Sequence, residues 1–287
     1  MILEQLKRGE GFSKTERMMA AYLLDNGAAV RTCSVAQLAD AMGVSTASVV
    51  RLCHKLGLAG YREFRVAFVA EYEQSRHTSA VDANVPFERA DTPEQIAWKL
   101  GNLTASALNS VISSLDFQQV GRVVERMRQA DVVNVYTVGT SIPAVLDFKI
   151  KMVRLGRAIN VDQDVMVQRG FATSASQGSF NLLISMSGET DPIVSYARIL
   201  RARGRYCVAI TTDPASRLAS LSDEVLLMGT REAESFSHKI ETFSSFDATH
   251  FLLDCLYCWL FQADYDRNAA HAQESQRLLL EYTHDSR

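Results

Sequence analysis

The segment SVAQLADAMGVSTASVVRLCHKLGL, residues 34–58, predicts two short helices joined by a tight turn. Ser34 and Ser45 are placed to cap the two helices, and Gly43 supplies the turn between them. Ala39 is a small residue at the point where the two helices would cross. The apolar positions of the second helix recur on one face, at Val49, Leu52 and Leu56. The segment therefore predicts a helix-turn-helix whose second helix packs through one side only.

The opposite face of that second helix carries short polar side chains first and cations further on. Short polar groups at a helix N-terminus suit base edges and phosphates, and Arg51 has the geometry for a bidentate contact to guanine. We therefore predict that this helix enters the major groove of double-stranded DNA. The expected DNA contacts are Ser45, Thr46, Ser48, Arg51, Lys55 and, on the following helix, Arg62. A helical hairpin that contacts only protein is the alternative.

Outward from this segment, the first part of the chain reads as short helices and the next part as a linker. Ser13 and Glu16 form a capping-box pattern ahead of an apolar helix, and another helix is expected from Tyr61 to about Tyr72. The stretch that follows is polar and aperiodic. We predict an all-α DNA-binding domain over residues 1–75, a linker over 76–92, and a second domain over 93–287.

The second domain has the sequence pattern of an α/β fold. Two amphipathic helices, about 93–113 and 116–129, precede a region in which short apolar runs alternate with helical segments. Such alternation predicts a doubly wound parallel sheet covered by helices on both faces. The expected strands are Val132–Val138, Ala158–Val161, Asn181–Met186, Tyr206–Thr211 and Glu224–Met228, and a long final helix is expected over Ser244–Gln262.

Two strand-to-helix turns in this domain combine hydroxyl groups, a glycine and a proline. The first is TVGTS (137–141) with Pro143, and the second is SMSGET (185–190) with Pro192. Proline fits the first turn of a helix, where its missing N–H costs nothing. Hydroxyls and free backbone N–H groups at a helix N-terminus bind phosphate, and in a parallel sheet both turns lie at the carboxyl edge. The pattern predicts a site for a phosphorylated ligand, without a cofactor or a metal.

Several motifs resemble known families. SxSGxT after a buried strand is similar to the phosphate loop of the SIS (sugar isomerase) domain, and the first turn with KMVRLG (151–156) resembles that family's other loop. SKTER (13–17), LADAMGVSTASVVRLCHKLGL and GYREFR (60–65) resemble the N-terminal part of RpiR/MurR-family regulators of sugar metabolism. The resemblance departs at Thr137, where the family loop usually has its first glycine.

The resemblance implies a homodimer or homotetramer that binds a palindromic operator and a phosphorylated sugar effector. By matching position it implies ligand contacts from both turns: Gly139, Thr140, Ser141, Ser185, Ser187, Gly188 and Thr190. SIS domains also often bring ligand groups from the segment ahead of the last helix, which here holds Ser237, His238 and Glu241. The predicted function is a transcriptional regulator and not an enzyme. Because most members of the family that it resembles are repressors, we expect it to repress sugar catabolism genes. The alternatives are a phosphosugar isomerase that uses Glu241 and His238, and an interaction module with a degenerate pocket.

The amino-acid composition agrees with a two-domain regulator and argues against a secreted disulfide-rich protein or a membrane-spanning protein. The chain has 287 residues, 47% of them hydrophobic, which suits two globular domains. Its net charge of −3 is divided unevenly, with +2 in residues 1–77 and −5 in the remainder. Five scattered cysteines argue against a disulfide framework, and the pair Cys255 and Cys258 lies in an apolar run that suits core packing. With no apolar run long enough to span a membrane and no signal-peptide pattern, we expect a cytoplasmic protein.

Overall fold

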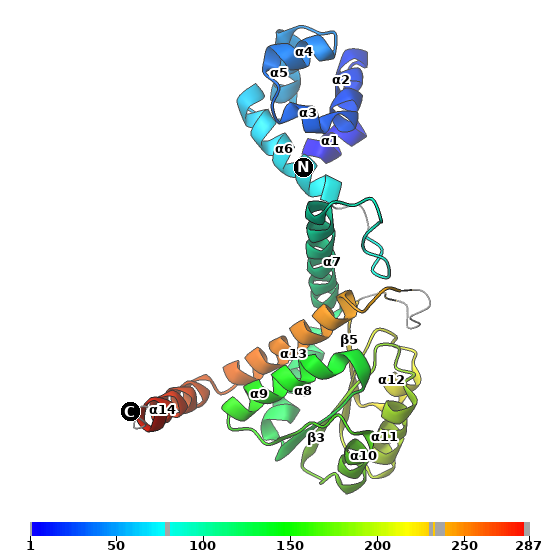
Figure 1. The fold of residues 1–287 in the computed structure, drawn as a ribbon, viewed down its shortest axis with the longest axis vertical. Coiled ribbons are helices and arrows are strands. Elements are labelled where there is room, and N and C mark those ends of the chain that lie inside the picture. Colours follow the sequence, from blue (N-terminus) through cyan, green and yellow to red (C-terminus); the bar gives the residue numbers. More distant parts are fainter. Residues whose placement is uncertain (1, 78–80, 230–231, 233–238, 284–287) are drawn as a thin grey trace. The chain divides into compact units, whose positions relative to one another are not determined.

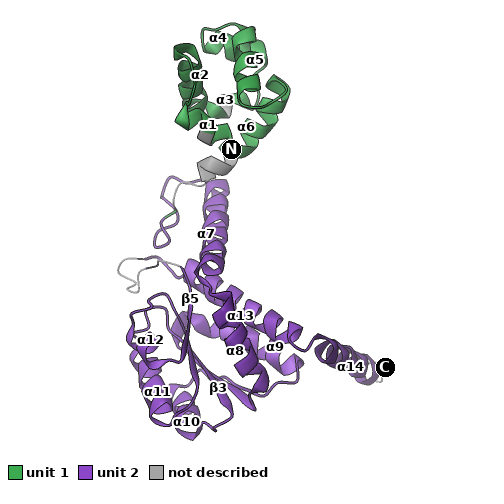
Figure 2. Cartoon of the chain, turned by 180° about the vertical axis from the view of Figure 1, so that it is seen from behind, with its two compact units in different colours: residues 1–81 green, residues 82–287 purple. Residues whose placement is uncertain are grey.

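The structure, a computed structural model, describes residues 2–77, 81–229, 232 and 239–283 (Figure 1). The chain divides into unit 1, residues 1–81, and unit 2, residues 82–287 (Figure 2). Each unit has its own hydrophobic core, so each is described by itself.

Unit 1 is helical throughout its described part. Three of its helices begin at a serine whose hydroxyl accepts a backbone N–H, and for Ser13 and Ser34 the capping box is complete. The carboxylate of Glu71 accepts the backbone N–H groups of Ile2 and Leu3, both at 2.9 Å, and so joins the last helix to the start of the first. The helices are α1 (Ile2–Arg8), α2 (Lys14–Asp25), α3 (Gly27–Val30), α4 (Val35–Ala41), α5 (Thr46–Lys55) and α6 (Tyr61–His77).

Unit 2 is built on strands and helices that alternate along the chain. Its first helix begins at a capping box formed by Thr92 and Gln95, with Pro93 in the first turn. The elements are α7 (Pro93–Ser114), α8 (Phe117–Gln129), β1 (Val132–Tyr136), the 3₁₀ turn η1 (Gly139–Ser141), α9 (Ile142–Arg154), β2 (Ile159–Asn160), α10 (Val165–Ser174), β3 (Ser179–Ile184), α11 (Asp191–Ala202), β4 (Cys207–Thr211), α12 (Arg217–Leu221), β5 (Glu224–Leu227), α13 (Ser244–Gln262) and α14 (Tyr265–Thr283).

The five strands form one sheet in the order β2-β1-β3-β4-β5, and every neighbouring pair is parallel. Alternate residues of each strand face opposite layers of helices. Phe180 and Leu182 of β3 belong to the core shared with α8, α9 and α13, whereas Leu183 belongs to the core shared with α10, α11 and α12. The two layers lie on either side of the sheet in Figure 1. The predicted doubly wound α/β fold is confirmed.

A row of asparagines crosses the sheet inside unit 2. Asn160, Asn134 and Asn181 pair in register on β2, β1 and β3. Asn160 donates to the Asn134 side-chain oxygen at 2.9 Å, and Asn134 donates to the Asn181 oxygen at 3.0 Å. The hydroxyl of Tyr136 donates to the same Asn181 oxygen at 3.2 Å. Asn134 and Asn181 are buried, Asn160 is half-buried, and the three are hydrogen-bonded in a row, so this asparagine row favours one alignment of the three strands.

The sequence places most elements within a few residues of where the structure has them. All five strands form, each shorter than or offset from its expected range by a few residues. The helices α1, α3 and α14 were not expected, and α13, which is found at Ser244–Gln262 as predicted, is therefore not the last. No helix in the described part of the chain is long and apolar enough to cross a membrane.

Candidate nucleic-acid interface and ligand site

The turn and second helix of residues 34–58 have the geometry of a helix-turn-helix. Gly43 has φ of +65°, a left-handed conformation that suits glycine at the turn between α4 and α5. Ala39 is buried where the two helices pack together. The Ser45 hydroxyl accepts the backbone N–H of Ser48 at 3.2 Å and caps α5. The buried side of α5 consists of Val49, Leu52 and Cys53.

The other side of α5 presents the predicted DNA contacts to solvent. Ser45, Thr46 and Arg51 are exposed, Ser48 is half-buried, and Arg62 is exposed in the first turn of α6. The hydroxyls of Ser45 and Ser48 lie 3.0 Å apart, and Arg51 Nη2 donates to the Ser48 hydroxyl at 3.0 Å. No carboxylate of the described residues pairs with Arg51. Its guanidinium therefore keeps donors for an anion or a base edge.

Lys55 differs from Arg51 because unit 1 itself binds its ammonium group. Lys55 Nζ donates to the Gly11 carbonyl at 2.6 Å and to the Glu16 carboxylate at 2.8 Å, and it lies 5.4 Å from the centre of the Phe12 ring. The hydrogen bond from Lys55, with one from the backbone N–H of Ser13, lowers the pKa of Glu16 to about 2. Lys55 thus joins α5 to the turn before α2.

In unit 2, the sheet order brings the two predicted phosphate turns to one edge. The turn 137–141 follows β1 and the turn 185–190 follows β3, and these strands are parallel neighbours. Both turns therefore leave the sheet at its carboxyl edge, where ligands bind in folds of this class. The sequence alone predicted the two turns, and the pairing of β1 with β3 places them side by side.

The second turn is an ordered loop of hydroxyl groups. The hydroxyls of Ser185 and Thr190 are 2.7 Å apart, and the Gly188 backbone N–H donates to the Ser185 hydroxyl at 3.1 Å. Ser187, half-buried, accepts the Glu189 N–H at 3.1 Å. Gly188 has φ of +70°, and a Cβ there would lie 2.1 Å from the Ser216 hydroxyl oxygen. Only glycine fits this position without moving the backbone of the loop.

A carboxylate in this loop is balanced by an arginine. The Glu189 carboxylate accepts the backbone N–H of Arg217 at 2.7 Å and also pairs with its guanidinium. Arg217 Nη2 reaches Asp191 at 3.1 Å as well. Hydrogen bonds from Arg217 lower the pKa of Glu189, so this carboxylate stays ionised and paired. The pairing ties the loop to α12 and limits the repulsion that Glu189 would exert on a bound phosphate.

The first turn accommodates the departure at Thr137 by burying it. The side-chain amide of Gln168 binds both sides of the Thr137 peptide, accepting its N–H at 3.1 Å and donating to its carbonyl at 2.8 Å. The Thr137 hydroxyl donates to the Ile184 carbonyl at 3.4 Å. Beyond it, Gly139 has φ of +68°, Thr140 is exposed and Ser141 is buried at the start of α9. The Thr137 side chain therefore lies between the ends of β1 and β3.

The segment before α13 carries two carboxylates in different surroundings, Glu241 and Glu232. Glu241 is exposed, and its carboxylate accepts the N–H of Thr242 at 2.8 Å. Ser237 and His238 lie outside the described residues. The carboxylate of Glu232 accepts hydrogen bonds from the backbone N–H groups of Phe243 and Ser244, at 3.0 and 2.6 Å. It also accepts one hydrogen bond from the Ser244 hydroxyl and one from the Ser245 hydroxyl. Glu232 is an isolated acid in an aperiodic stretch, so no sequence signal marked it as the residue that satisfies the α13 N-terminus.

One group of described residues has donor atoms for a metal ion. Atoms of Asp147, His250 and Asp254 lie within 4.8 Å of one another on α9 and α13. The ammonium of Lys151 contacts both carboxylates of this group. The protein thus supplies its own cation at this place.

Comparisons with known proteins agree with both halves of this description. Residues 1–75 match the model of the helix-turn-helix domain of the rpiR family, and residues 126–257 match the SIS domain. The Vibrio vulnificus NanR protein, solved in complex with ManNAc-6P, is 26% identical, with 98% of each chain covered and a TM-score of 0.59.

Two further solved structures share the fold of unit 2. The sugar isomerase domain of an RpiR transcription factor from Sphaerobacter thermophilus is 18% identical over 64% of this chain and 99% of that one, with a TM-score of 0.55. A putative sugar-phosphate isomerase from Listeria monocytogenes is 15% identical over 63% of this chain and 99% of that one, with a TM-score of 0.53. At these identities the likeness shows the fold alone.

Proposed function

Because this chain joins an rpiR-family helix-turn-helix domain to a SIS domain, the domain composition of RpiR/MurR-family regulators, we propose that it is a transcriptional regulator whose affinity for DNA is set by a bound sugar phosphate. The observation that carries the proposal is the solvent-facing side of α5. There, a capped helix N-terminus, two hydroxyls and the guanidinium of Arg51, which pairs with no carboxylate of the described residues, lie together. These are groups that read phosphates and base edges.

The ligand we propose is a phosphorylated sugar held at the carboxyl edge of the sheet. The ordered hydroxyl loop 185–190 and the facing turn 139–141 supply neutral donors at the starts of α11 and α9, which suit a phosphate. NanR was solved with ManNAc-6P, so this compound is the first candidate to test. The proposed contacts are Gly139, Thr140, Ser141, Ser185, Ser187, Gly188, Thr190 and, from the segment before α13, Glu241.

The proposal also covers the oligomeric state, whether the protein represses or activates transcription, and where in the cell it acts. We propose a homodimer or homotetramer on a palindromic operator, because two copies of a helix-turn-helix read two half-sites. We propose that the protein represses sugar catabolism genes while it is bound to DNA. The sugar phosphate would relieve this repression by releasing the protein from DNA. We propose that it acts in the cytoplasm, where its five free thiols would stay reduced.

We propose that unit 2 senses its ligand without converting it. An isomerase needs a carboxylate base that is free to reach the sugar. The carboxylate of Glu232 is occupied by the α13 N-terminus, and that of Glu241, which we propose as a binding contact rather than a base, accepts the N–H of Thr242. Incubation with ManNAc-6P and other sugar phosphates should therefore leave each compound unchanged. Turnover that scales with protein concentration would favour the isomerase alternative.

Substitution of Arg51 tests the DNA half of the proposal. Arg51→Ala should weaken operator binding by about ten- to hundredfold, the loss of one bidentate base contact, and leave the oligomeric state unchanged. Arg31→Ala, which removes an exposed arginine of unit 1 outside α5, is the matched control. Binding measured by gel shift that survives Arg51→Ala at full strength would contradict the assignment of α5.

Substitution of Ser187 tests the ligand half. Thermal shift with a panel of sugar phosphates first identifies a compound that raises the midpoint of the wild type. Ser187→Ala should then weaken the response of operator binding to that compound and leave binding without it intact. Ser195→Ala, on the exposed side of α11, is the control. An unchanged effector titration in Ser187→Ala would remove this loop from the site.

A further inference from the structure

A second concave site lies in unit 2, at the edge of the sheet opposite the hydroxyl loops. It is a cavity of about 530 Å³. Gln177, Tyr206 and Asp223 line it, and each comes shortly before a strand, namely β3, β4 and β5. Because the strands are parallel, their starts share one edge, and their ends form the other. The cavity is therefore separate from the proposed sugar-phosphate site.

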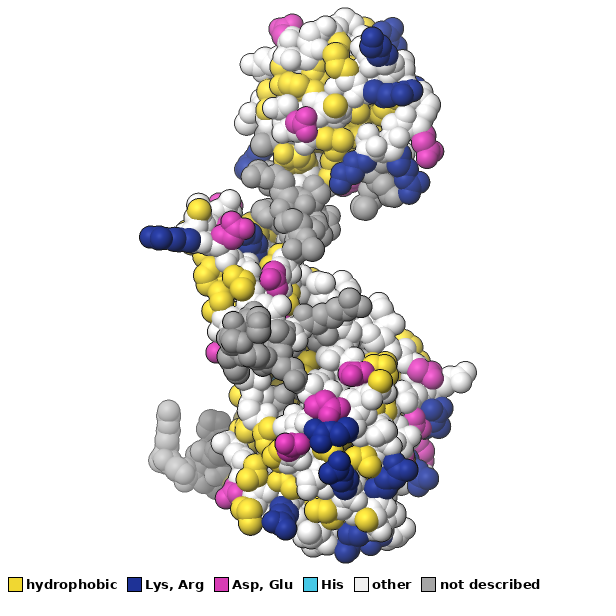
Figure 3. All heavy atoms as spheres, turned by 90° about the vertical axis from the view of Figure 1, so that its right-hand side faces the viewer, with side chains coloured by type: hydrophobic (Ala, Val, Ile, Leu, Met, Phe, Trp, Pro, Cys, Tyr) yellow, Lys and Arg dark blue, Asp and Glu magenta, His cyan; other side chains and the backbone are white. Residues whose placement is uncertain are grey.

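Arginines from separate elements surround this cavity. Arg126 comes from α8, Arg201 from α11, and Arg205 from the turn between α11 and β4. The segment RILRARGRY, residues 198–206, holds four arginines and no acid. On the face of the molecule seen in Figure 3, Lys and Arg side chains gather over the lower part of unit 2.

The three cavity arginines are bound by neutral groups. Arg201 donates to the Ser220 carbonyl at 2.5 Å. Arg205 donates to the Ala175 carbonyl at 2.9 Å and to the Gln177 side-chain oxygen. The guanidinium of Arg126 lies over the Tyr206 ring, 5.2 Å from its centre. Among the described residues, no carboxylate forms an ion pair with any of the three.

Nearby acids are already occupied elsewhere. Glu224 pairs with Arg122 at 2.7 Å, and Glu125 pairs with Arg128 at 2.8 Å. Asp223, the carboxylate that lines the cavity, accepts the backbone N–H of Cys207 at 2.8 Å. The cavity therefore keeps an excess of positive charge, in contrast to the carboxyl edge, where Arg217 is paired with Glu189. Burial raises the pKa of Tyr206 to about 12, so its phenol is neutral here.

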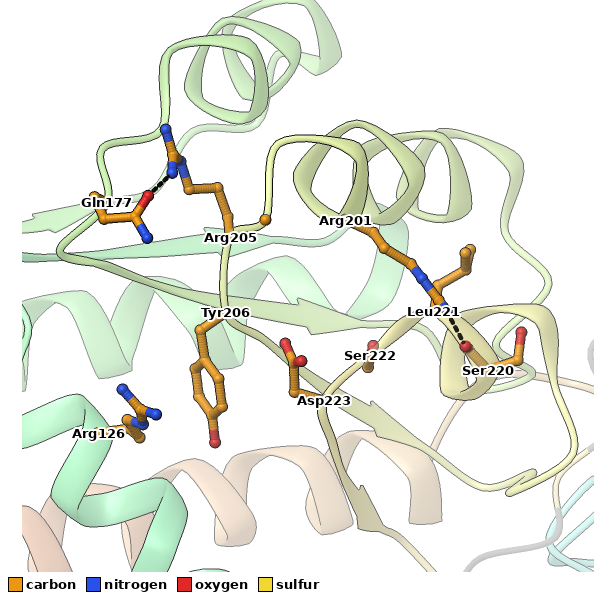
Figure 4. Close-up of a pocket in the computed structure, with 10 residues that line it drawn as sticks. Arg126, Gln177, Arg201, Arg205, Tyr206, Ser220, Leu221, Ser222 and Asp223 are labelled. Atoms are coloured by element: carbon orange, nitrogen blue, oxygen red, sulfur yellow. Dashed lines mark hydrogen bonds between the residues drawn. The ribbon is translucent and has the colours of Figure 1, made fainter.

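We propose that this cavity binds a small metabolite with at least two anionic groups, phosphates or carboxylates, independently of the sugar phosphate at the other edge. Its volume is in the range of small-molecule sites. A guanidinium has five N–H donors, so the bonds already made leave donors for an anion. In Figure 4, Arg126 lies beside Tyr206 and Arg201 lies across Asp223 from it. Charges so separated suit two anionic groups better than one.

Calorimetric titration of the full-length protein with pyrophosphate and with citrate, at constant ionic strength, tests this proposal. The wild type should bind at least one of these probes. Arg126→Gln with Arg201→Gln should weaken that binding about tenfold or more, because two charge-assisted contacts are lost. Arg154→Ala, which removes an exposed arginine of α9 outside the cavity, should leave probe binding unchanged.

Three results would overturn the proposal. The first is no binding of either probe to the wild type at millimolar concentration. The second is binding by the double variant as strong as that of the wild type. The single variant Arg126→Gln is the folded reference, because among the described residues Arg126 forms no hydrogen bond or ion pair and its guanidinium lies over the Tyr206 ring. The third is a double variant that binds the probes normally but loses affinity for non-specific duplex DNA, which would make these arginines a DNA surface.

Discussion

At the scale of single residues, Arg51 and Lys55 show how the same charge takes two roles on one helix. Both are exposed cations on α5. Among the described residues, the side chain of Arg51 donates a hydrogen bond only to the Ser48 hydroxyl, whereas Lys55 is held by Glu16 and the Gly11 carbonyl. The sequence placed both on one polar face. It could not separate them, because the partner of Lys55 lies 39 residues away in the chain.

The Lys55–Glu16 pair predicts a pH dependence of stability. The pKa of Glu16 is about 2 in the folded protein against a usual 4.5, so the ionised carboxylate stabilises the fold above pH 4.5 and this contribution is lost as the pH falls toward 2. Glu16→Gln should therefore lower the free energy of unfolding of unit 1 at pH 7, and the difference from wild type should shrink toward pH 2. Urea denaturation across this range measures it, with Lys55→Met completing a double-mutant cycle. A difference that is constant with pH would contradict the pairing.

At the scale of elements, the asparagine row is the feature that fixes how β2, β1 and β3 align. Asn134 is its centre, bonded to Asn160 on one side and Asn181 on the other. A shift by one residue would break these bonds and turn each side chain to the opposite helix layer. Apolar patterning alone leaves such buried strands free to slide, so the polar row adds what the apolar residues do not specify.

Replacement of the central asparagine should therefore destabilise unit 2. Asn134→Leu removes the acceptor of the Asn160 amide and one donor to the Asn181 oxygen, which then keeps only the Tyr136 hydroxyl, and the expected cost is about 1–3 kcal/mol. Asn109→Leu, on the exposed side of α7, is the matched control and should change stability by less than about 0.5 kcal/mol. Chemical denaturation of both variants measures the difference. Equal stability of Asn134→Leu and wild type would show that the row contributes little.

The sequence predicted elements where burial leaves a pattern and missed those where it does not. The strands were found because both faces of β1, β3 and β4 are buried, which gives continuous apolar runs. Helix α14 was missed because most of Tyr265–Thr283 is exposed, so no apolar stripe marks it. The hydroxyl loop was predicted from local sequence. Glu232 and the arginine cavity were not, because only the tertiary fold brings their partners together.

At the scale of the whole molecule, separate cores predict separate responses to core mutations. Leu52 belongs to the core of unit 1 and Leu252 to that of unit 2, and both are buried. Leu52→Ala and Leu252→Ala should each cost about 2–5 kcal/mol. Hydrogen exchange followed by mass spectrometry should show faster exchange only in the unit that carries the change. Faster exchange in both units after either substitution would mean that the two cores unfold together.

The parallel sheet of unit 2 limits how its two edges could influence each other. Strand β4 has five residues, so at about 3.3 Å each it separates the edges by roughly 16 Å. The Debye length at physiological ionic strength is about 8 Å, so anions bound at the two solvent-open edges would scarcely feel each other's field. Any communication between them would have to be mechanical, through sliding or tilting of the strands and of helices α11 and α12. If the sheet is rigid, binding at one edge would leave the affinity of the other edge unchanged. If the strands shift, binding at one edge would change the affinity of the other.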